Sequence, residues 1–465
     1  MRIFNRYLSS YDLALVVGDF VLSLFSSIVV RWIVIVVDAP ARIDWLLWTS
    51  HGLAMGFVVV MSFYYSDLYA IDQTLSLREL LLRFMGALGT ACIVIGIASY
   101  PIPNFSKQFY LSEMAVMAIC LIIWRVSFLR IISIARSHAR VLVVGLQAIG
   151  KMVAEELCRQ KKLGMEVVGF IGNAPGEVTL SYGNPKRKVL PVFASRSLLS
   201  FIEQKGISRI LLAGGEGCPD TLVKDLLALR AKGLPIEDCH SFYERLVSKI
   251  PIADLTPEWI VLSKGFRRDR LVMMTKRIID QVVSLVGLTL SAPLCLLVVA
   301  LIKLESRGPV FYRQERVGQG EKTFTLYKFR SMTEGAEDSM GPVWAARNDP
   351  RVTRVGRIIR KLRIDEIPQM YNVLKGEMSF VGPRPERPFF VEQLKGKIPY
   401  YYLRHSVKPG ITGWAQISYP YGDSEEGAIE KLQYDLYYIK NMSPLFDLQI
   451  IFESFKVILL GTGAR

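Results

Sequence analysis

Residues 278–302 read IIDQVVSLVGLTLSAPLCLLVVALI, and this stretch does most to decide the fold. Its 25 residues carry one charge, Asp280, and a helix of this length crosses about 30 Å of hydrocarbon. Ser291 and Pro293 lie near the middle, where proline removes a backbone donor and bends or breaks a helix. Basic residues flank both ends: Lys276, Arg277, Lys303 and Arg307. We therefore expect a broken, re-entrant helix with its break at Ser291 and Pro293, and a kinked spanning helix is the alternative.

The composition favours a membrane protein of two or three domains. Of the 465 residues, 51% are hydrophobic, and the mean hydropathy of +0.29 is high for a soluble protein. The net charge of +15 is typical of nucleic-acid-binding proteins, but no such fold signature appears, and cations beside apolar segments explain the charge. Six cysteines without a CxxC pair and four scattered histidines argue against a disulfide framework and a zinc site.

The first third of the chain, residues 1–135, contains four segments of membrane-spanning length. They are Leu13–Val37, Trp45–Tyr64, Leu80–Tyr100 and Leu111–Ile132. Basic residues precede the first segment and follow the fourth, at Arg2, Arg6, Arg136 and Arg140, while the loop Asp38–Asp44 is acidic. The positive-inside rule therefore places both ends of this four-helix transmembrane unit in the cytoplasm. Arg31 inside the first segment either reaches an interface or marks an internal polar contact.

Residues 136–255 predict a Rossmann-like α/β domain, and residues 256–275 a linker. The expected elements are strands at Val141–Gly145, Glu166–Ile171 and Arg209–Ala213, with helices at Lys151–Gln160 and Leu222–Ala231. Such alternation favours a parallel sheet with helical crossovers. The Gly, Pro and Lys content of Pro175–Pro191 predicts a loop.

The turn Gly145-Leu-Gln147-Ala-Ile-Gly150 occupies the place of a dinucleotide fingerprint. Gln147, however, replaces the middle glycine that lets a backbone approach a pyrophosphate. The second strand also ends in Ile171-Gly172-Asn173, without the acidic residue that binds a ribose. We therefore expect no NAD in this domain.

A basic run surrounds a pair of carboxylates in the last third of the chain. The sequence Arg360-Lys-Leu-Arg-Ile-Asp365-Glu366 is followed closely by Gly382-Pro383-Arg384-Pro385. Seven cations precede the pair: Arg347, Arg351, Arg354, Arg357, Arg360, Lys361 and Arg363. Guanidinium groups bind phosphate, and an Asp kept ionised beside them is a covalent nucleophile or a metal ligand. A solvated basic face that holds anionic lipid headgroups is the alternative.

The chain from about Lys276 to the C-terminus resembles the bacterial sugar transferase family, the monotopic polyprenyl-phosphate hexose-1-phosphate transferases. The matching motifs are Lys276-Arg277-x-x-Asp280, Ser306-Arg-Gly308-Pro309 to Gly318, Tyr327-Lys328-Phe329-Arg330-Ser331-Met332, the Asp365-Glu366 segment, Pro383-Arg384-Pro385, and Val407-Lys408-Pro409-Gly410-Ile-Thr412-Gly413-Trp414. They cover roughly 190 of 465 residues, in the order that the family has them. The resemblance implies a mostly α, monotopic catalytic domain at 276–465.

The resemblance also implies the reaction and its residues. A UDP-sugar would give its sugar-1-phosphate to undecaprenyl phosphate and release UMP, in the priming step of exopolysaccharide, capsule or O-antigen synthesis. Asp365 would be the nucleophile, and Glu366, a second catalytic residue, would bind Mg²⁺. Four residues would bind phosphate or substrate: Arg360, Arg384, Lys328 and Arg330. Lys276 and Arg277 would anchor the helix at the headgroups. The expected location is the bacterial cytoplasmic membrane with both soluble domains in the cytoplasm, as a homodimer.

Two other classes of function are open to the sequence. In the first, the protein is a membrane-anchored nucleotide-sensing regulator or scaffold, whose Rossmann-like domain is the functional part. In the second, the protein is a glycosyltransferase that moves the sugar alone and releases UDP. The intact Asp365-Glu366 pair and Gln147 argue against the first. If the C-terminal domain carries catalysis alone, a fragment that begins near Thr256 keeps measurable activity.

Overall fold

The structure is a computed structural model, and it describes most of the chain. The described residues are 2–3, 6–7, 10–38, 45–66, 68–69, 77–99, 107–135, 139–160, 164–182, 186–194, 198–214, 220–252, 255, 257–263, 265–266, 269–335, 351–419 and 424–460. Of the features discussed above, Arg136, Arg347 and residues 39–44 of the acidic loop lie outside these ranges. From Tyr7 onward the chain forms two compact units, Tyr7–Phe242 and Tyr243–Arg465.

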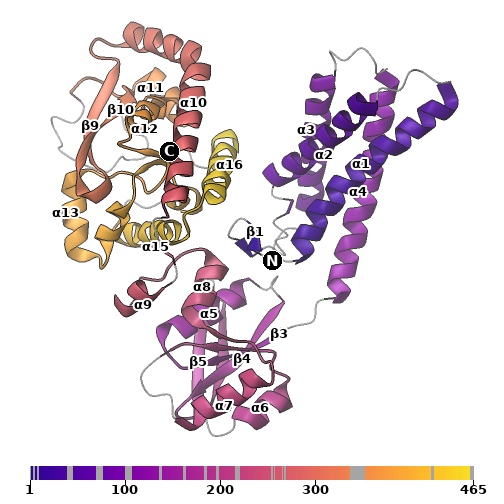
Figure 1. Ribbon diagram of the computed structural model, residues 1–465, viewed down its shortest axis with the longest axis vertical. Helices are drawn as coiled ribbons and strands as arrows, with labels where there is room; N and C mark the ends of the chain where they lie inside the picture. The colour runs from indigo at the N-terminus through magenta and orange to yellow at the C-terminus, as the bar shows by residue number, and fades with distance from the viewer. Residues whose placement is uncertain are drawn as a thin grey trace. The chain divides into compact units, whose positions relative to one another are not determined.

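The first unit begins with long apolar helices (Figure 1). They are α1 (Ser10–Asp38), α2 (Trp45–Tyr65), α3 (Leu77–Ser99) and α4 (Lys107–Ala135), after the short strands β1 (Arg2–Ile3) and β2 (Arg6–Tyr7). Among the described residues of this unit, Leu13–Trp32 and Leu111–Phe128 are long and apolar enough to cross a membrane, and Leu82–Gly96 is a shorter apolar stretch. Helix α1 packs against both α4 and α2. These helices are compatible with membrane anchoring.

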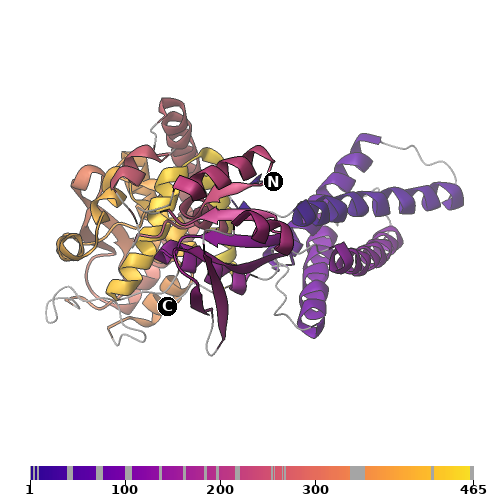
Figure 2. The same ribbon diagram turned by 90° about the horizontal axis from the view of Figure 1, so that it is seen from below.

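A six-stranded sheet completes the first unit (Figures 1 and 2). Its strands are β3 (Ala139–Val144), β4 (Met165–Gly172), β5 (Gly176–Ser181), β6 (Arg187–Ala194), β7 (Arg209–Leu212) and β8 (Ile236–Asp238). The spatial order is β5-β6-β4-β3-β7-β8, in which only the edge strand β5 runs antiparallel to its neighbour. The predicted loop Pro175–Pro191 is wrong, because most of it forms the β5–β6 hairpin. The alternation of exposed and buried positions in β5, with Leu180 inside, outweighs its loop-like composition.

Helices cover both faces of this sheet because its strands are parallel and buried. Leu142 and Val144 of β3 pack with α6 (Leu198–Lys205) and α7 (Asp220–Ala231). Val143 faces the other way, toward α5 (Ala148–Arg159), where a Cβ on Gly150 would lie 3.1 Å from Val143 Cγ1. The expected α/β alternation is therefore present, with the strands and helices close to their predicted positions.

The second unit is mostly helical and has its own core. Its helices are α8 (Cys239–Val247, which begins in the first unit), α9 (Pro257–Leu262), α10 (Arg270–Glu305), α11 (Arg354–Lys361), α12 (Gln369–Lys375), α13 (Pro388–Lys397), α14 (Trp414–Ser418), α15 (Glu425–Asn441) and α16 (Pro444–Leu460). Two hairpin strands, β9 (Phe311–Val317) and β10 (Thr323–Phe329), and a parallel pair, β11 (Ser379–Val381) and β12 (Gly410–Thr412), complete it. Among the described residues of this unit, 3₁₀ turns lie at Gln319–Glu321, Ile364–Glu366 and Tyr401–Ser406.

The core of the second unit begins earlier in the sequence than the predicted domain boundary. Ile250, Ile252 and Leu255 pack in the same cluster as Trp414 and Tyr437. Backbone and side-chain hydrogen bonds reinforce this packing, since the Trp414 indole donates to the Ser248 carbonyl at 2.9 Å. The segment that begins at Tyr243 and precedes the predicted boundary is therefore part of the helical unit.

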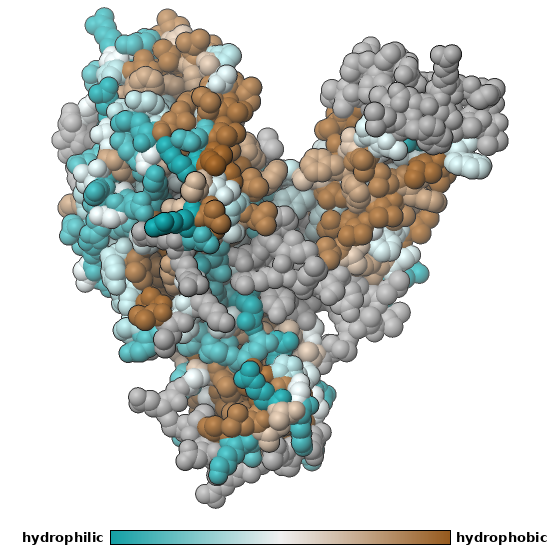
Figure 3. Space-filling model, viewed as in Figure 1, coloured by the Kyte–Doolittle hydropathy of each residue, from teal (hydrophilic) through white to brown (hydrophobic). Residues whose placement is uncertain are grey.

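Helix α10 is continuous through Ser291 and Pro293, where the sequence predicted a break. Its 36 residues are apolar enough to cross a membrane. Pro293 lies inside the helix, and the ribbon changes direction toward its upper end in Figure 1. A proline removes one backbone hydrogen bond and bends a helix without ending it when the flanking turns are stable. Figure 3 shows apolar side chains gathered along one side of the unit that contains this helix. Leu285 and Leu296 of α10 are 59% and 72% exposed.

Candidate active site

Asp365 and Glu366 lie in a 3₁₀ turn between two short helices. Helix α11 ends at Lys361, the turn covers Ile364–Glu366, and α12 starts at Gln369. Arg363 adopts a left-handed conformation with φ of 57°, which redirects the chain between the two helices. In a 3₁₀ turn neighbouring side chains are about 120° apart, somewhat more than in the α-helix that the sequence suggested. Both carboxylates are buried, at 7% exposure, and point to different surroundings.

Glu366 is bound by three cations. Its Oε1 accepts from the Arg384 guanidinium at 2.8 Å, from Lys328 Nζ at 3.2 Å and from Arg363 at 3.4 Å. Burial would raise the pKa of Glu366, but the charges of Arg384, Lys328 and Arg363 outweigh it and hold the pKa well below its usual range. Glu366 is therefore ionised throughout the physiological pH range.

Asp365 differs from its neighbour in both contacts and charge. Within the described part of the chain, no side chain or backbone group donates a hydrogen bond to its carboxylate. Burial and the Glu366 charge raise the pKa of Asp365 to about 6, although Lys328, Arg360 and Arg363 oppose the shift. The nearby cations therefore do not lower the pKa of Asp365 below its ordinary value, because Lys328 and Arg363 bind Glu366 directly. The carboxylate is still mostly ionised at neutral pH, and its oxygens are available for bonding.

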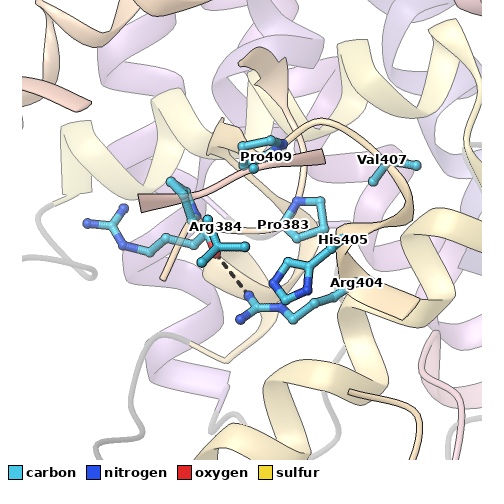
Figure 4. A pocket seen from close by; sticks show the side chains of 9 residues that line it. Pro383, Arg384, Arg404, His405, Val407 and Pro409 are labelled. Atoms are coloured by element: carbon cyan, nitrogen blue, oxygen red, sulfur yellow. Dashed lines mark hydrogen bonds between the residues drawn. The ribbon is translucent and has the colours of Figure 1, made fainter. Parts of the chain in front are cut away.

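Arg384 belongs to a loop whose backbone is bound by Arg404 (Figure 4). The carbonyl of Arg384 accepts a hydrogen bond from the Arg404 guanidinium at 2.9 Å, while the Arg384 side chain points away from Arg404 and His405. Arg404 in turn binds Asp435 at 3.0 Å, and both side chains are buried. A Cβ at Gly382 would lie 2.5 Å from the Lys408 carbonyl, so the loop needs glycine there. The bond from Arg404 and the close fit at Gly382 hold the backbone from which the Arg384 side chain extends.

Of the other predicted site residues, Lys328 and Arg360 interact with the carboxylate pair, whereas Arg330 binds elsewhere. Lys328 lies at the carboxylate pair, and burial lowers its pKa while Glu366 opposes the shift. Arg360 acts on Asp365 through its charge. Arg330 instead donates to the carbonyls of Ser306 and Arg307 at 2.9 and 2.8 Å, where it caps the end of α10. Arg363, which the sequence analysis did not single out beyond the basic run, joins the site, and its position three residues before Glu366 was the available signal.

Lys276 and Arg277, which were expected to anchor the helix at the headgroups, make hydrogen bonds inside the second unit. Lys276 is 6% exposed and pairs with Asp447 at 2.7 Å. Arg277 donates to the carbonyls of Val373 and Leu374 at 2.6 and 2.9 Å. Each side chain finds several acceptors inside the unit, and these replace the hydration that a headgroup anchor would keep.

The two carboxylates are compatible with a magnesium ion that has few protein ligands. The described residues contain no group of three or more His, Cys, Asp or Glu side chains that would form an all-protein metal site. Mg²⁺ commonly takes one or two carboxylates and completes its shell with water and substrate phosphate. The cations at Glu366 all bind Oε1, so the second oxygen of this carboxylate is compatible with such an ion.

Comparison with known proteins identifies the family of the C-terminal part of the chain. Residues 271–461 match the bacterial sugar transferase family. The chain is 50% identical over 190 residues to a UDP-N-acetylgalactosamine-undecaprenyl-phosphate N-acetylgalactosaminephosphotransferase of Aeromonas hydrophila, covering 41% of this chain and 45% of that protein. It is 35% identical over 324 residues to the UDP-glucose:undecaprenyl-phosphate glucose-1-phosphate transferase of Escherichia coli (strain K12), covering 67% and 66%.

A third relative is shorter and is matched over nearly its whole length. The exopolysaccharide production protein PSS of Rhizobium leguminosarum bv. phaseoli is 42% identical over 188 residues, which is 39% of this chain and 92% of that protein. For the first two relatives the chain spans only about half to two thirds of their length. The chain belongs to the bacterial sugar transferase family.

Proposed function

We propose that this protein transfers a sugar-1-phosphate from a UDP-sugar to undecaprenyl phosphate, giving undecaprenyl-diphospho-sugar and UMP. The observation that carries the proposal is the difference in bonding between the two carboxylates. Glu366 is ionised and bound to three cations, while Asp365 has free oxygens in a buried place. The relatives from Aeromonas hydrophila and Escherichia coli are named for transfer of a sugar phosphate to undecaprenyl phosphate.

The reaction divides into two displacements at one phosphorus. An Asp365 oxygen attacks the phosphorus that carries the sugar, the bond from this phosphorus to the bridging oxygen breaks, and UMP leaves with the electron pair. The sugar phosphate is then an acyl phosphate on Asp365. An oxygen of undecaprenyl phosphate attacks the same phosphorus, and the Asp365 carboxylate leaves. Each step exchanges one phosphorus–oxygen bond for another, and kinetics of the ping-pong type follow.

The cations around the pair stabilise charge that grows on the phosphate oxygens. Arg384 and Lys328 converge on Glu366 Oε1, so a diphosphate that reaches Asp365 would meet both. Arg360 adds positive charge on the Asp365 side. Glu366 would hold Mg²⁺, which supplies positive charge to the diphosphate when bound. Arg330 acts in this scheme through the end of α10.

Helix α10 enters the membrane and returns to the same side in this proposal. Lys276, near its beginning, pairs with Asp447, and Ile302, near its end, packs against Phe329 and Ile359. All of these partners belong to one folded unit, so the two ends of α10 lie on one side of the bilayer. The bend at Pro293 is then the deepest part, and the site lies at the level of the lipid phosphates. The α1–α4 helices span the cytoplasmic membrane, and both soluble parts face the cytoplasm, where UDP-sugars are made.

The sugar is expected to be glucose or N-acetylgalactosamine, since relatives named for each sugar match this chain. The reaction primes an exopolysaccharide, capsule or O-antigen, and the protein works as a homodimer. The Rossmann-like domain is accessory. Its Gln147 side chain folds over Gly145, where its Oε1 lies 2.5 Å from the place of a Cβ, in the turn that would receive a dinucleotide.

The test is UMP release by purified protein with undecaprenyl phosphate, Mg²⁺ and a panel of UDP-sugars. We expect UMP from one or two sugars with the wild type and none with Asp365→Asn, while Arg330→Lys, which keeps a cation at the end of α10, loses far less activity. A labelled sugar phosphate trapped on the wild type without acceptor would identify the intermediate. Release of UDP would show transfer of the sugar alone, and NAD binding without any nucleotide release would favour a regulator.

A further inference from the structure

In its first half, helix α10 buries two charged side chains and exposes several apolar ones. Lys276, Asp280 and Ser284 are 6%, 3% and 0% exposed, and their spacing of four residues places them on one face. Val282 and Leu285 are 54% and 59% exposed. A charged residue that only held the helix at lipid headgroups would keep its charge in water. The buried charges therefore need a role inside the second unit.

The first partner of these charges is strand β11, which leads to Arg384. Asp280 Oδ1 accepts hydrogen bonds from the Phe380 amide at 2.8 Å and from Ser379 Oγ at 3.0 Å. Lys276 Nζ donates to the Val381 carbonyl at 2.9 Å. All residues of this strand are thus bound to one face of α10. Arg384 follows the end of the strand by three residues.

The second partner is helix α12, which follows Glu366. Arg277 donates to the carbonyls of Val373 and Leu374, near the end of that helix. At its beginning α12 lies close to α10, because a Cβ on Gly287 would be 2.8 Å from the Met370 sulfur. Seven residues form α12, which is too short to be stable without such contacts.

We propose that Lys276, Arg277 and Asp280, called here the α10 clamp, are positioning residues that hold β11 and α12 at the separation at which Arg384 binds Glu366. The clamp touches neither carboxylate of the pair, and it acts through the backbones of the two elements that carry the site. The activity test below rests on the proposed function. A displacement of about 1 Å in such a site costs about 100-fold in rate, so a loosened clamp has a large effect.

The decisive test is a double-mutant cycle between Asp280 and Arg384. Asp280→Ala removes the acceptor of β11, and we expect kcat of UMP release to fall by about 10- to 100-fold. In the Arg384→Ala background the same change should cost at most about threefold, because the interaction that the clamp supports is already lost. Losses that simply multiply would overturn the proposal. Asp280→Asn keeps an Oδ1 acceptor and should recover most of the activity.

A matched control separates the clamp from anchoring at headgroups. Arg270 is an exposed basic residue at the first position of α10, and Arg277 is the clamp residue seven positions later. We expect Arg270→Met to keep kcat within about twofold of the wild type, whereas Arg277→Met loses at least about tenfold. Equal losses in both variants would mean that positive charge at this end of the helix is what matters, and the clamp would be refuted.

Hydrogen exchange tests the clamp without any activity. In the Asp280→Ala variant the amides of residues 379–384 should exchange at least about tenfold faster, while those of the β9–β10 hairpin stay as in the wild type. Unchanged exchange at 379–384 would refute the clamp. A wild-type protein that releases no UMP would overturn the proposed function instead, and the clamp would then be judged by the exchange result alone.

Discussion

Two neighbouring acids in one turn, Asp365 and Glu366, differ in the direction of their pKa shifts. Glu366 and Asp365 are neighbours with equal exposure, yet one pKa is well below its usual range and the other is raised to about 6. The difference comes from direct contact, since Arg384, Lys328 and Arg363 all bind Glu366. Asp365 feels the remaining positive charge at a distance and the negative charge of Glu366 nearby. In the proposed mechanism, the Asp365 carboxylate is thereby left in a destabilised and more reactive form.

This arrangement predicts that Asp365 lowers the stability of the folded protein at neutral pH. Its folded pKa of about 6 exceeds the ordinary value of 3.8, so the folded state favours the protonated acid, and stability is lost as the pH rises from about 4 to about 6. The difference of about two pKa units corresponds to about 3 kcal/mol. We expect Asp365→Asn to be more stable than the wild type at pH 7 by up to this amount.

Denaturant unfolding of the two proteins between pH 4 and pH 7.5 measures this effect. The gain of the variant should grow with pH and disappear near pH 4, where both side chains are neutral. Glu366→Gln serves as the control and should be less stable than the wild type at pH 7, because it leaves three cations without their anion. A gain for Asp365→Asn that is equal at both ends of the pH range would contradict the raised pKa.

At this scale the sequence indicated the residues but not their arrangement. The density of arginines around Asp365 and Glu366, together with the family resemblance, led to the prediction of a site at these residues. Which acid receives the cations depends on the left-handed turn at Arg363 and on contacts with β10, and neither appears in the local sequence. Lys276 was assigned to the headgroups because its partner Asp447 is 171 residues away.

Charged side chains of helices α1 and α4 also pair with one another in the apolar part of the first unit. Asp19 of α1 binds Arg125 of α4 at 2.6 Å, and Arg125 also donates to the Leu68 carbonyl. Twelve residues further along α1, Arg31 is buried and interacts with Glu113, which lies twelve residues before Arg125 on α4. Matching steps in opposite directions fix the antiparallel register of the two helices. Arg31 therefore marks an internal contact, the second of the two expectations for it.

Loss of one partner should be costly, and loss of both should not. Arg125→Leu leaves Asp19 charged in an apolar place, and we expect a loss of about 3–5 kcal/mol. The double variant Asp19→Leu, Arg125→Leu should recover most of this loss, because an apolar pair of similar size needs no compensation. The midpoint of thermal unfolding in detergent measures both. Equal destabilisation in the single and double variants would show that the ion pair itself provides the stability.

Elements were predicted well where their pattern was local. The apolar helices and the parallel strands follow from hydropathy and alternation alone. The β5–β6 hairpin was missed because its composition is that of a loop. Helix α10 runs through Pro293, as in the kinked helix that was the alternative to a broken one.

At the scale of the whole chain, the boundary between the two units lies before the linker that the sequence suggested. Residues 243–255 belong to the second unit through Ile250 and Ile252 in its core and through Glu244, which accepts hydrogen bonds from Lys440 and Asn441 at 2.6 and 3.0 Å. Hydropathy alone did not reveal this, since the segment is short and its partners are nearly 200 residues away. The packing of distant segments is what fixes a domain boundary.

This boundary changes the design of an active fragment. A fragment 256–465 lacks Ile250, Ile252 and Leu255, each worth roughly 1.5–3 kcal/mol when buried, and should be unstable. A fragment 239–465 keeps helix α8 whole and should retain UMP release in detergent. Thermal unfolding and UMP release of both fragments test this, and a stable, active 256–465 fragment would contradict the assignment of residues 243–255 to the second unit.

One carboxylate oxygen with three cations around it has a consequence for the protein between turnovers. Without a substrate, Lys328, Arg363 and Arg384 already have an anion at their centre. Glu366 thus offsets part of the positive charge of the resting site, and its cations stay gathered because they share one anion. In the proposed function, the diphosphate of an incoming UDP-sugar therefore meets three cations that are already held in one place.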